Sequence, residues 1–218
     1  MYLYETHLHT KESSGCARVP AAEAVMMYVK AGYSGIVVTD HFSKNNYREL
    51  GAKSWGGYID LFLKGYRAAK AAAPQGFPVF LGIEIRFSNC NNDYLVFGAE
   101  EALLRGSEFI FNSNPGKFRA FCDKKGLLFI QAHPFRNNMT IIDPKYLHGI
   151  ETVNRHPRHD TRNDIAELWA EKWNLIRLSG SDFHEDEDLA LGGIYTKEKI
   201  SSNQQFIDIL KSGSYELK

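Results

Sequence analysis

The sequence lacks several features that mark specialised classes of protein. It has no excess of either charge, because 26 Lys and Arg residues balance 26 Asp and Glu residues, so its overall charge does not favour nucleic acid or anionic membranes. No apolar run is long enough to span a bilayer, and residues 1–7 lack the basic region and apolar stretch of a signal peptide. We therefore expect a cytoplasmic protein without a membrane partner.

Cysteine is also scarce, and nothing in the sequence suggests a linker. Cys16, Cys90 and Cys122 are odd in number and have no Cys-x-x-Cys spacing, which argues against a disulfide framework and a structural zinc clip. No stretch rich in Pro, Gly or Ser and no internal repeat divides the chain. Because 218 residues suffice for one sizeable core, we expect free thiols and a single domain over residues 1–218.

The chain does contain short apolar runs that alternate with helical patterns. Most of the runs are uninterrupted by polar residues, as buried parallel strands tend to be. They lie at residues 2–6, 35–39, 79–83, 94–98, 127–132, 149–153 and 175–179. Helices are predicted over 21–31, 58–73, 117–125, 160–173 and 202–211. This alternation predicts an α/β fold of parallel strands and crossover helices, either a barrel or, almost equally well, an open doubly wound sheet.

Metal-ligand residue types follow at least five of the predicted strands, at the face where α/β folds place their active sites. These candidates are His7, His9, His41, Glu84, His133, Asp182 and His184. A single His at a strand end is more often structural than a ligand, but five of the eight histidines fall at such positions. Alternate residues of an extended chain point the same way. His7 and His9 can therefore reach one metal ion, and so can Asp182 and His184. The concentration of polar residues at one end favours the barrel.

Two carboxylates among these motifs leave alternatives open. Asp40, beside His41, either orients a ligating imidazole or caps the following turn. Glu84 ends a buried strand, where an unpaired charge is costly; it either bridges two metal ions or pairs with a cation such as Arg86. Imidazoles and carboxylates without thiolates suit zinc, manganese or iron. Seven ligands exceed the needs of one tetrahedral zinc ion, so we expect two or three divalent ions.

As a set, these motifs resemble those of the polymerase and histidinol phosphatase (PHP) family of metal-dependent phosphoesterases, in the family's order over nearly the whole chain. They are His7-x-His9, Thr39-Asp40-His41, Gly82-Ile83-Glu84, Ala132-His133-Pro134 and Ser181-Asp182-x-His184. The resemblance implies a distorted (β/α)7 barrel. It implies a first metal held by His7, His9, Glu84 and Asp182, a second shared by Glu84 and His133, and a third held by His41 and His184.

The sequence departs from the family pattern at two places. After the first motif the family usually has an Asp or His, whereas this chain reads Lys11-Glu12-Ser13-Ser14-Gly15-Cys16 with Ser at the expected position. Glu12 or Cys16 could substitute as a ligand of the third metal. Many relatives have a His near the fourth strand; this chain offers Asp93 before that strand and Glu100 after it.

Cations for an anionic substrate are present after the predicted strands. Arg136 and Arg158 suit bidentate phosphate recognition, with a solvated surface position as the alternative. His156 and His159 are either loop residues without a role, which we favour, or include a proton donor to the leaving group.

With the family resemblance, these patterns predict an enzyme that hydrolyses phosphoric esters. We expect a phosphomonoesterase that acts on a small phosphorylated metabolite through a metal-bound hydroxide, with Asp182, His184 and Arg136 as catalytic residues. The neutral chain lacks the basic track of a nuclease, so nucleic acid is not the expected partner. The alternatives are a nuclease or phosphodiesterase acting on nucleic acid, a non-catalytic metal-binding accessory module, and an enzyme that hydrolyses a C–N or lactone bond.

Overall fold

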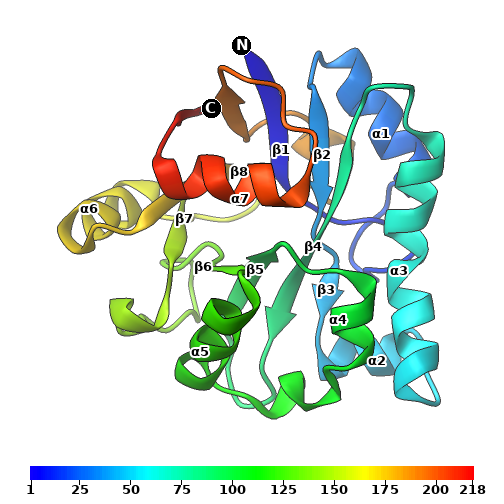
Figure 1. The fold of residues 1–218 in the computed structure, drawn as a ribbon, viewed down its shortest axis with the longest axis horizontal. Helices are drawn as coiled ribbons and strands as arrows, with labels where there is room; N and C mark the ends of the chain where they lie inside the picture. Colours follow the sequence, from blue (N-terminus) through cyan, green and yellow to red (C-terminus); the bar gives the residue numbers. More distant parts are fainter.

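The computed structural model describes residues 1–218 and contains one strongly curved sheet of ten strands (Figure 1). The strands are β1 (Tyr2–Leu8), β2 (Gly35–Val38), β3 (His41–Phe42), β4 (Val79–Arg86), β5 (Asp93–Phe97), β6 (Leu128–Gln131), β7 (Gly149–Asn154), β8 (Ile176–Gly180), β9 (Ile194–Thr196) and β10 (Tyr215–Leu217). Their order is β10-β9-β1-β2-β4-β5-β6-β7-β8, and β3 pairs with β4 off this path. A parallel bridge between Leu8 and Phe183 brings the chain after β8 back to β1. The sheet is therefore a nearly closed barrel.

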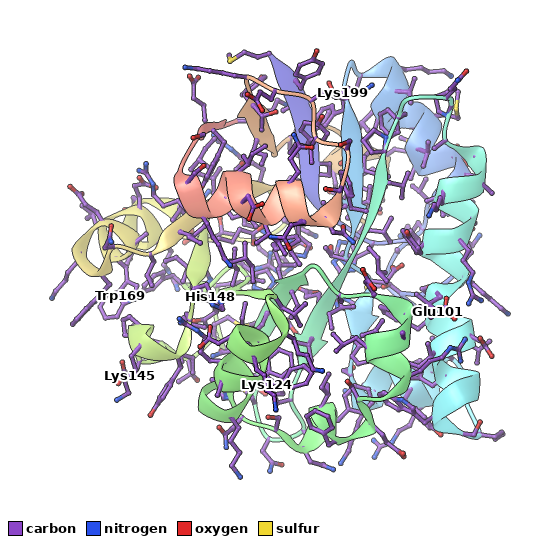
Figure 2. All side chains as sticks on the ribbon, in the orientation of Figure 1. Glu101, Lys124, Lys145, His148, Trp169 and Lys199 are labelled. Atoms are coloured by element: carbon purple, nitrogen blue, oxygen red, sulfur yellow. The ribbon has the colours of Figure 1, made fainter.

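Seven α-helices accompany the sheet. They are α1 (Ala21–Lys30), α2 (Lys44–Glu49), α3 (Trp55–Ala72), α4 (Glu101–Arg105), α5 (Pro115–Lys125), α6 (Asn163–Trp173) and α7 (Asn203–Ser212). Side-chain caps set several of their starts: Ser54 accepts a hydrogen bond from Gly57 N before α3, and Asn114 accepts one from Lys117 N before α5. In Figure 1, α1 and α3 run side by side along one flank of the sheet. Glu101, Lys124 and Trp169, labelled in Figure 2, mark α4, α5 and α6 in the outer layer.

The two faces of β4 explain how the fold positions a polar site. Phe80 belongs to the core inside the barrel, and its ring centroid lies 6.0 Å from that of Phe206 on α7. Ile83 and Ile85 belong instead to the core between sheet and helices. Because side chains alternate along a strand, Glu84 points inward like Phe80, but at the opposite end of the strand. Helix α7 thus covers one end of the barrel and Glu84 lies at the other.

The predicted α/β barrel is confirmed, with one correction to its topology. All seven predicted strands are present, as β1, β2, β4, β5, β6, β7 and β8. However, β5 is antiparallel to both of its neighbours, β4 and β6, whereas parallel strands were predicted throughout. The connection over residues 87–92 is too short for the crossover that a parallel pair requires. No helix in the structure has the length and apolar character needed to cross a membrane.

Candidate metal centre

All seven predicted ligands come together at the end of the barrel opposite α7, with Glu84 at the centre. The Glu84 side chain is 1% exposed. Imidazole nitrogens lie 3.2, 3.5, 2.7 and 3.3 Å from its oxygens, in the order His7, His9, His41 and His133. The strands and their carboxyl-terminal extensions thus direct side chains from distant parts of the sequence into one buried cluster.

The first group of ligands comes from β1 and the segment after β8. Phe183 N donates to His7 O at 3.1 Å and His9 N donates to Phe183 O at 2.9 Å, so the two motifs with one-residue spacing run alongside each other. As a result, the Nε2 atoms of His7 and His9 are 3.2 Å apart, and Asp182 Oδ1 lies 3.4 and 3.5 Å from them, respectively. With Glu84, these side chains form a compact set of four donors.

The second group contains Glu84, Asp93 and His133, whose candidate ligand atoms lie within 4.8 Å of one another. Asp93 reaches this end because β5 is antiparallel, so its first residue lies beside Arg86 at the end of β4. For the same reason Glu100, which follows β5, lies at the other end, where it lines a cavity with Gly98 and Lys125. The structure therefore supports Asp93 and contradicts Glu100 as a possible ligand.

The third group contains His9, His41 and His184, whose candidate ligand atoms also lie within 4.8 Å of one another. Cys16 is exposed and lines the same cavity as His41 and His184. Glu12, the other candidate in this segment, is occupied elsewhere: both of its carboxylate oxygens accept hydrogen bonds from Ala21 N, at 3.1 and 2.9 Å. The prediction that Glu12 could be a metal ligand is wrong, because its carboxylate caps the start of α1.

The absence of hydrogen bonds to Glu84 indicates that these side chains suit metal ions. Both of its oxygens are buried and accept no hydrogen bond, despite the surrounding imidazoles. Its alternative partner, Arg86, instead forms two hydrogen bonds with Asp93, at 2.6 and 2.5 Å. A buried carboxylate that accepts no hydrogen bond is costly, and divalent cations between it and the converging ring nitrogens would satisfy it. The donor set fits zinc, manganese or iron.

Electrostatic interactions within the cluster favour an ionised Glu84 and a protonated His7. Burial alone would raise the pKa of Glu84, but His7 and His41 hold it well below its usual value. Burial would likewise lower the pKa of His7, but Asp182, Glu151 and Glu84 raise it well above its usual value. His9 differs, because burial and the nearby His184 and His41 lower its pKa. Protons therefore occupy part of the site when cations do not.

Glu151 is a residue of the site that the sequence analysis missed. Its Oε1 lies 2.9 Å from His7 Nδ1, and its Oε2 accepts hydrogen bonds from His133 N at 3.0 Å and Asn154 Nδ2 at 2.9 Å. Such a contact fixes the orientation of a ligating imidazole. The available signal was a carboxylate inside the buried run Gly149-Ile150-Glu151, where an acid needs a partner.

Asp40 supports His9 indirectly, by holding the turn that follows β1. Its carboxylate accepts hydrogen bonds from Thr10 N, Thr10 Oγ1 and Ser14 Oγ, each at 2.7 Å, and Ser14 Oγ lies 3.4 Å from His9 Nδ1. Asp40 thus holds the turn that supports His9, rather than contacting that imidazole directly. Burial raises the pKa of Asp40 to about 6, although these hydrogen bonds oppose the increase.

Two of the predicted ligands have a left-handed backbone conformation. His133 has a φ of 28° and Asp182 a φ of 54°, values that cost non-glycine residues about 1–3 kcal/mol. Gly180 allows the close approach beside them, since a Cβ there would lie 2.5 Å from His7 Cβ. The fold therefore maintains an unfavourable backbone where these side chains enter the cluster.

The two predicted substrate arginines have different surroundings. Arg136 Nη2 lies 2.6 Å from Asp182 Oδ2, and Arg136 Nε is buried without a partner. Arg158 pairs with Asp188 at 2.8 Å and also contacts Glu185. Both line a cavity of about 500 Å³ over the cluster. Arg136 therefore retains an unpaired donor, whereas Arg158 is engaged by two carboxylates.

Of the three remaining histidines, two line the cavity and one directly precedes β7. His156 and His159 line the cavity, with ring centroids 4.8 Å apart; burial lowers the pKa of both, that of His156 to about 4. His148, labelled in Figure 2, is structural: Nδ1 accepts from Phe129 N at 3.0 Å and Nε2 lies 2.8 Å from Asp123.

Comparison with known proteins reveals similarity at the level of structure alone. Neither a protein-family model nor a curated protein matches the sequence. A two-domain protein from Bacteroides vulgatus containing a predicted PHP-like metal-dependent phosphoesterase has a TM-score of 0.69 and 17% identity, covering 100% of this chain and 64% of that one. PsfC from Pseudomonas syringae has a TM-score of 0.67 and 20% identity, covering 94% and 87%.

The lesion-specific endonuclease PfuEndoQ from Pyrococcus furiosus also shares the fold. Its TM-score is 0.64 at 13% identity, covering 99% of this chain and 57% of that chain. The present chain thus spans less than two thirds of the Bacteroides and Pyrococcus proteins. The nearly closed barrel and these similarities agree with the resemblance found in the sequence motifs. The chain has the distorted β/α barrel fold of the PHP-like metal-dependent phosphoesterases.

Proposed function

We propose that this protein is a metal-dependent hydrolase of phosphoric esters, with its active site at the end of the barrel opposite α7. The observation that carries the proposal is the convergence of imidazoles and carboxylates on Glu84, whose two buried oxygens accept no hydrogen bond. The structures that share the fold include a protein containing a predicted PHP-like phosphoesterase and an endonuclease, which supports chemistry at a phosphate group.

The chain offers places for two or three ions of zinc, manganese or iron. His7, His9, Glu84 and Asp182 would hold the first, and Glu84, with Asp93 and His133, the second. His41 and His184 would contribute to a third. When bound, such ions lower the pKa of water, orient substrate oxygens and neutralise charge in the transition state.

Protein side chains would position the substrate within the cavity. Arg136 is 14% exposed and has a buried Nε without a partner, so it can donate to a phosphoryl oxygen in the substrate complex. Asp182 and His184 also line this cavity and were predicted to be catalytic. We assign them to orienting the reacting water and Arg136 to binding phosphate.

The charges around the cavity favour a small phosphorylated metabolite as the substrate. Its arginines are matched by carboxylates: Arg18 with Glu185 at 3.1 Å, Arg86 with Asp93, Arg136 with Asp182, and Arg158 with Asp188. Binding a nucleic acid backbone ordinarily requires a track of unpaired cations. The alternative, cleavage of nucleic acid, is favoured by the shared fold of the Pyrococcus endonuclease.

A comparison of substrates tests both the chemistry and the preference. Protein reconstituted with zinc, manganese or iron is assayed on an aryl phosphate, a panel of phosphorylated metabolites and an end-labelled oligonucleotide. We expect hydrolysis of monoesters, with the oligonucleotide intact. Rapid oligonucleotide cleavage would replace the small-substrate assignment with the nuclease alternative. Failure to hydrolyse any phosphate ester with stoichiometric metal bound would refute the proposed activity and favour an accessory metal-binding module.

A further inference from the structure

A second cavity adjoins the one over the cluster, and we call it the α2 cavity because residues of α2 and its cap line it. Its volume is about 530 Å³. The two cavities share the lining residues Cys16, His41, Glu84, Arg86 and Asp93, so they meet at the central carboxylate. A substrate whose phosphate lies in the first cavity can therefore extend its leaving group into the α2 cavity.

The two cavities differ in the charges that they offer a substrate. Arg136, whose buried Nε has no partner, lines the first cavity and not the second. The only Lys or Arg of the α2 cavity is Arg86, which forms two hydrogen bonds with Asp93, at 2.6 and 2.5 Å. Glu49 adds an exposed carboxylate to this cavity. The phosphate thus belongs in the first cavity, and the α2 cavity disfavours a second phosphate on the substrate because like charges repel.

Helix α2 presents two polar side chains to its cavity from a fixed position. Ser43 caps the helix by accepting a hydrogen bond from Asn46 N at 3.1 Å, and Asn46 Nδ2 donates to Ser13 O at 2.7 Å. Asn45 and Glu49 are one turn apart on this helix and line the cavity together. Both side chains are exposed and form no hydrogen bond or ion pair within the chain. They are therefore available to bind a ligand.

The side chains of the α2 cavity suit hydroxyl groups better than other substituents. Ser43 and Asn45 can donate and accept hydrogen bonds, and the Glu49 carboxylate accepts them. Hydroxyl groups satisfy both kinds of side chain, whereas an ammonium group offers no acceptor to the donors of Ser43 and Asn45. No aliphatic side chain and no Phe, Tyr or Trp lines this cavity, so an alkyl chain or a nucleobase has no apolar surface to pack on.

We propose that the substrate is a monophosphate of a sugar or a polyol, and that Asn45 and Glu49 bind hydroxyl groups of its leaving group. The inference rests on the proposed function, because the ester is cleaved at the metal centre. Hydrolysis breaks the ester P–O bond: water gives its hydroxyl to phosphorus and a proton to the leaving oxygen, so the products are inorganic phosphate and the free sugar or polyol. Asn45 and Glu49 contact the leaving group, and they therefore determine which esters are hydrolysed.

Esters of equal length separate recognition of hydroxyl groups from hydrolysis itself. Hexose and hexitol monophosphates are compared with hexyl phosphate, which has the same number of carbons and no hydroxyl group. The full-length protein, loaded with zinc, manganese or iron, is assayed on these esters, on a nucleoside monophosphate and on an amino-alcohol monophosphate. We expect kcat/KM for the best hydroxylated ester to exceed each of the other values by about tenfold or more, because polar groups of the site would otherwise lose their partners.

Substitutions on α2 test the two residues. Asn45→Ala and Glu49→Ala should each lower the ratio of kcat/KM for the best hydroxylated ester to that for hexyl phosphate, by about three- to tenfold for the loss of one or two hydrogen bonds. Glu23→Ala is the matched control, because Glu23 is exposed on α1 and lines neither cavity; its ratio should equal that of wild type. Far-ultraviolet circular dichroism verifies the folding of each variant.

Three results would overturn the proposal while leaving the phosphoesterase activity intact. They are equal kcat/KM for hydroxylated and hexyl esters, a preference for the nucleotide or the amino-alcohol ester, and an unchanged ratio in either α2 variant. Hydrolysis of none of the esters by the metal-loaded protein would instead refute the proposed function, and this inference with it. The assay thus distinguishes failure of the leaving-group assignment from failure of the activity.

Discussion

Replacing Glu151 with Gln should weaken metal binding although Glu151 is not itself a predicted ligand. The carboxylate is surrounded by donors: Oε1 faces His7 Nδ1, and Oε2 accepts from His133 N and Asn154 Nδ2. An amide has the same shape but presents an NH2 group at one end. In one orientation the glutamine NH2 group faces His7 Nδ1, and in the other it faces His133 N and Asn154 Nδ2. Two donors then face each other in either case, so Glu151→Gln cannot preserve all three contacts.

The size of the effect follows from which contact is lost. If the amide nitrogen faces His133 and Asn154, two buried hydrogen bonds are lost, at about 1–3 kcal/mol for each unsatisfied donor. If it faces His7, the imidazole must move its proton from Nδ1 to Nε2, the nitrogen that lies 3.2 Å from Glu84. That change removes the lone pair needed by a metal. Loss of such an orienting contact typically lowers metal affinity by about 10–100-fold.

Zinc affinity is measured by competition with a chromophoric chelator, and the free energy of unfolding of the metal-free protein by urea titration. Glu167→Gln is the matched control, because Glu167 pairs with Arg177 and is 40% exposed; a surface ion pair contributes only about 0.2–1 kcal/mol. We expect the control to bind zinc normally. Wild-type zinc affinity in Glu151→Gln would refute the argument that this carboxylate orients His7.

Three other predictions address the ligands, pH dependence and packing. His9→Ala and Asp182→Ala should each reduce turnover by more than the roughly 10–100-fold expected for an outer-shell change while leaving the far-ultraviolet spectrum unchanged; wild-type activity in either variant would contradict their assignment. Burial lowers the pKa of His7, but neighbouring carboxylates raise it well above its usual value overall. Zinc affinity should therefore be highest above that raised pKa and fall with acidification, by about tenfold per pH unit for each proton displaced. A zinc affinity that does not change across pH 5–9, measured at intervals of about one pH unit, would count against competition between protons and metal. Gly65→Ala should lower the free energy of unfolding by about 1–3 kcal/mol, because its Cβ would lie 1.9 Å from Thr10 Oγ1; an unchanged urea midpoint would show that the helix can move aside.

The ends of β5 illustrate where prediction from the sequence failed. The strands predicted at 79–83 and 94–98 were expected to be parallel, but the observed strands extend to Arg86 and begin at Asp93. The remaining connection permits only an antiparallel return. This reversal brings Asp93 to the cluster and removes Glu100 from it, a choice that the composition of the two flanking segments did not decide.

Contacts between distant segments account for the other differences. Glu12 and Glu151 are both carboxylates, but one caps α1 and the other supports His7 and His133. Their different roles depend on which backbone donors lie next to each carboxylate in the folded chain. Residue type alone therefore identified neither the structural role of Glu12 nor the supporting role of Glu151.

The sequence by itself determined the α/β class, the places of the seven main strands and the identity of the ligand types that follow them. These features were readable because buried strands require uninterrupted apolar runs, and strand ends on one rim direct their side chains into a common region. Only the tertiary structure decided the direction of β5, the partners of each carboxylate and the position of Cys16 in the cavity that His41 and His184 also line. Those outcomes depend on pairing and hydrogen bonding between residues far apart in the chain, which local periodicity does not encode.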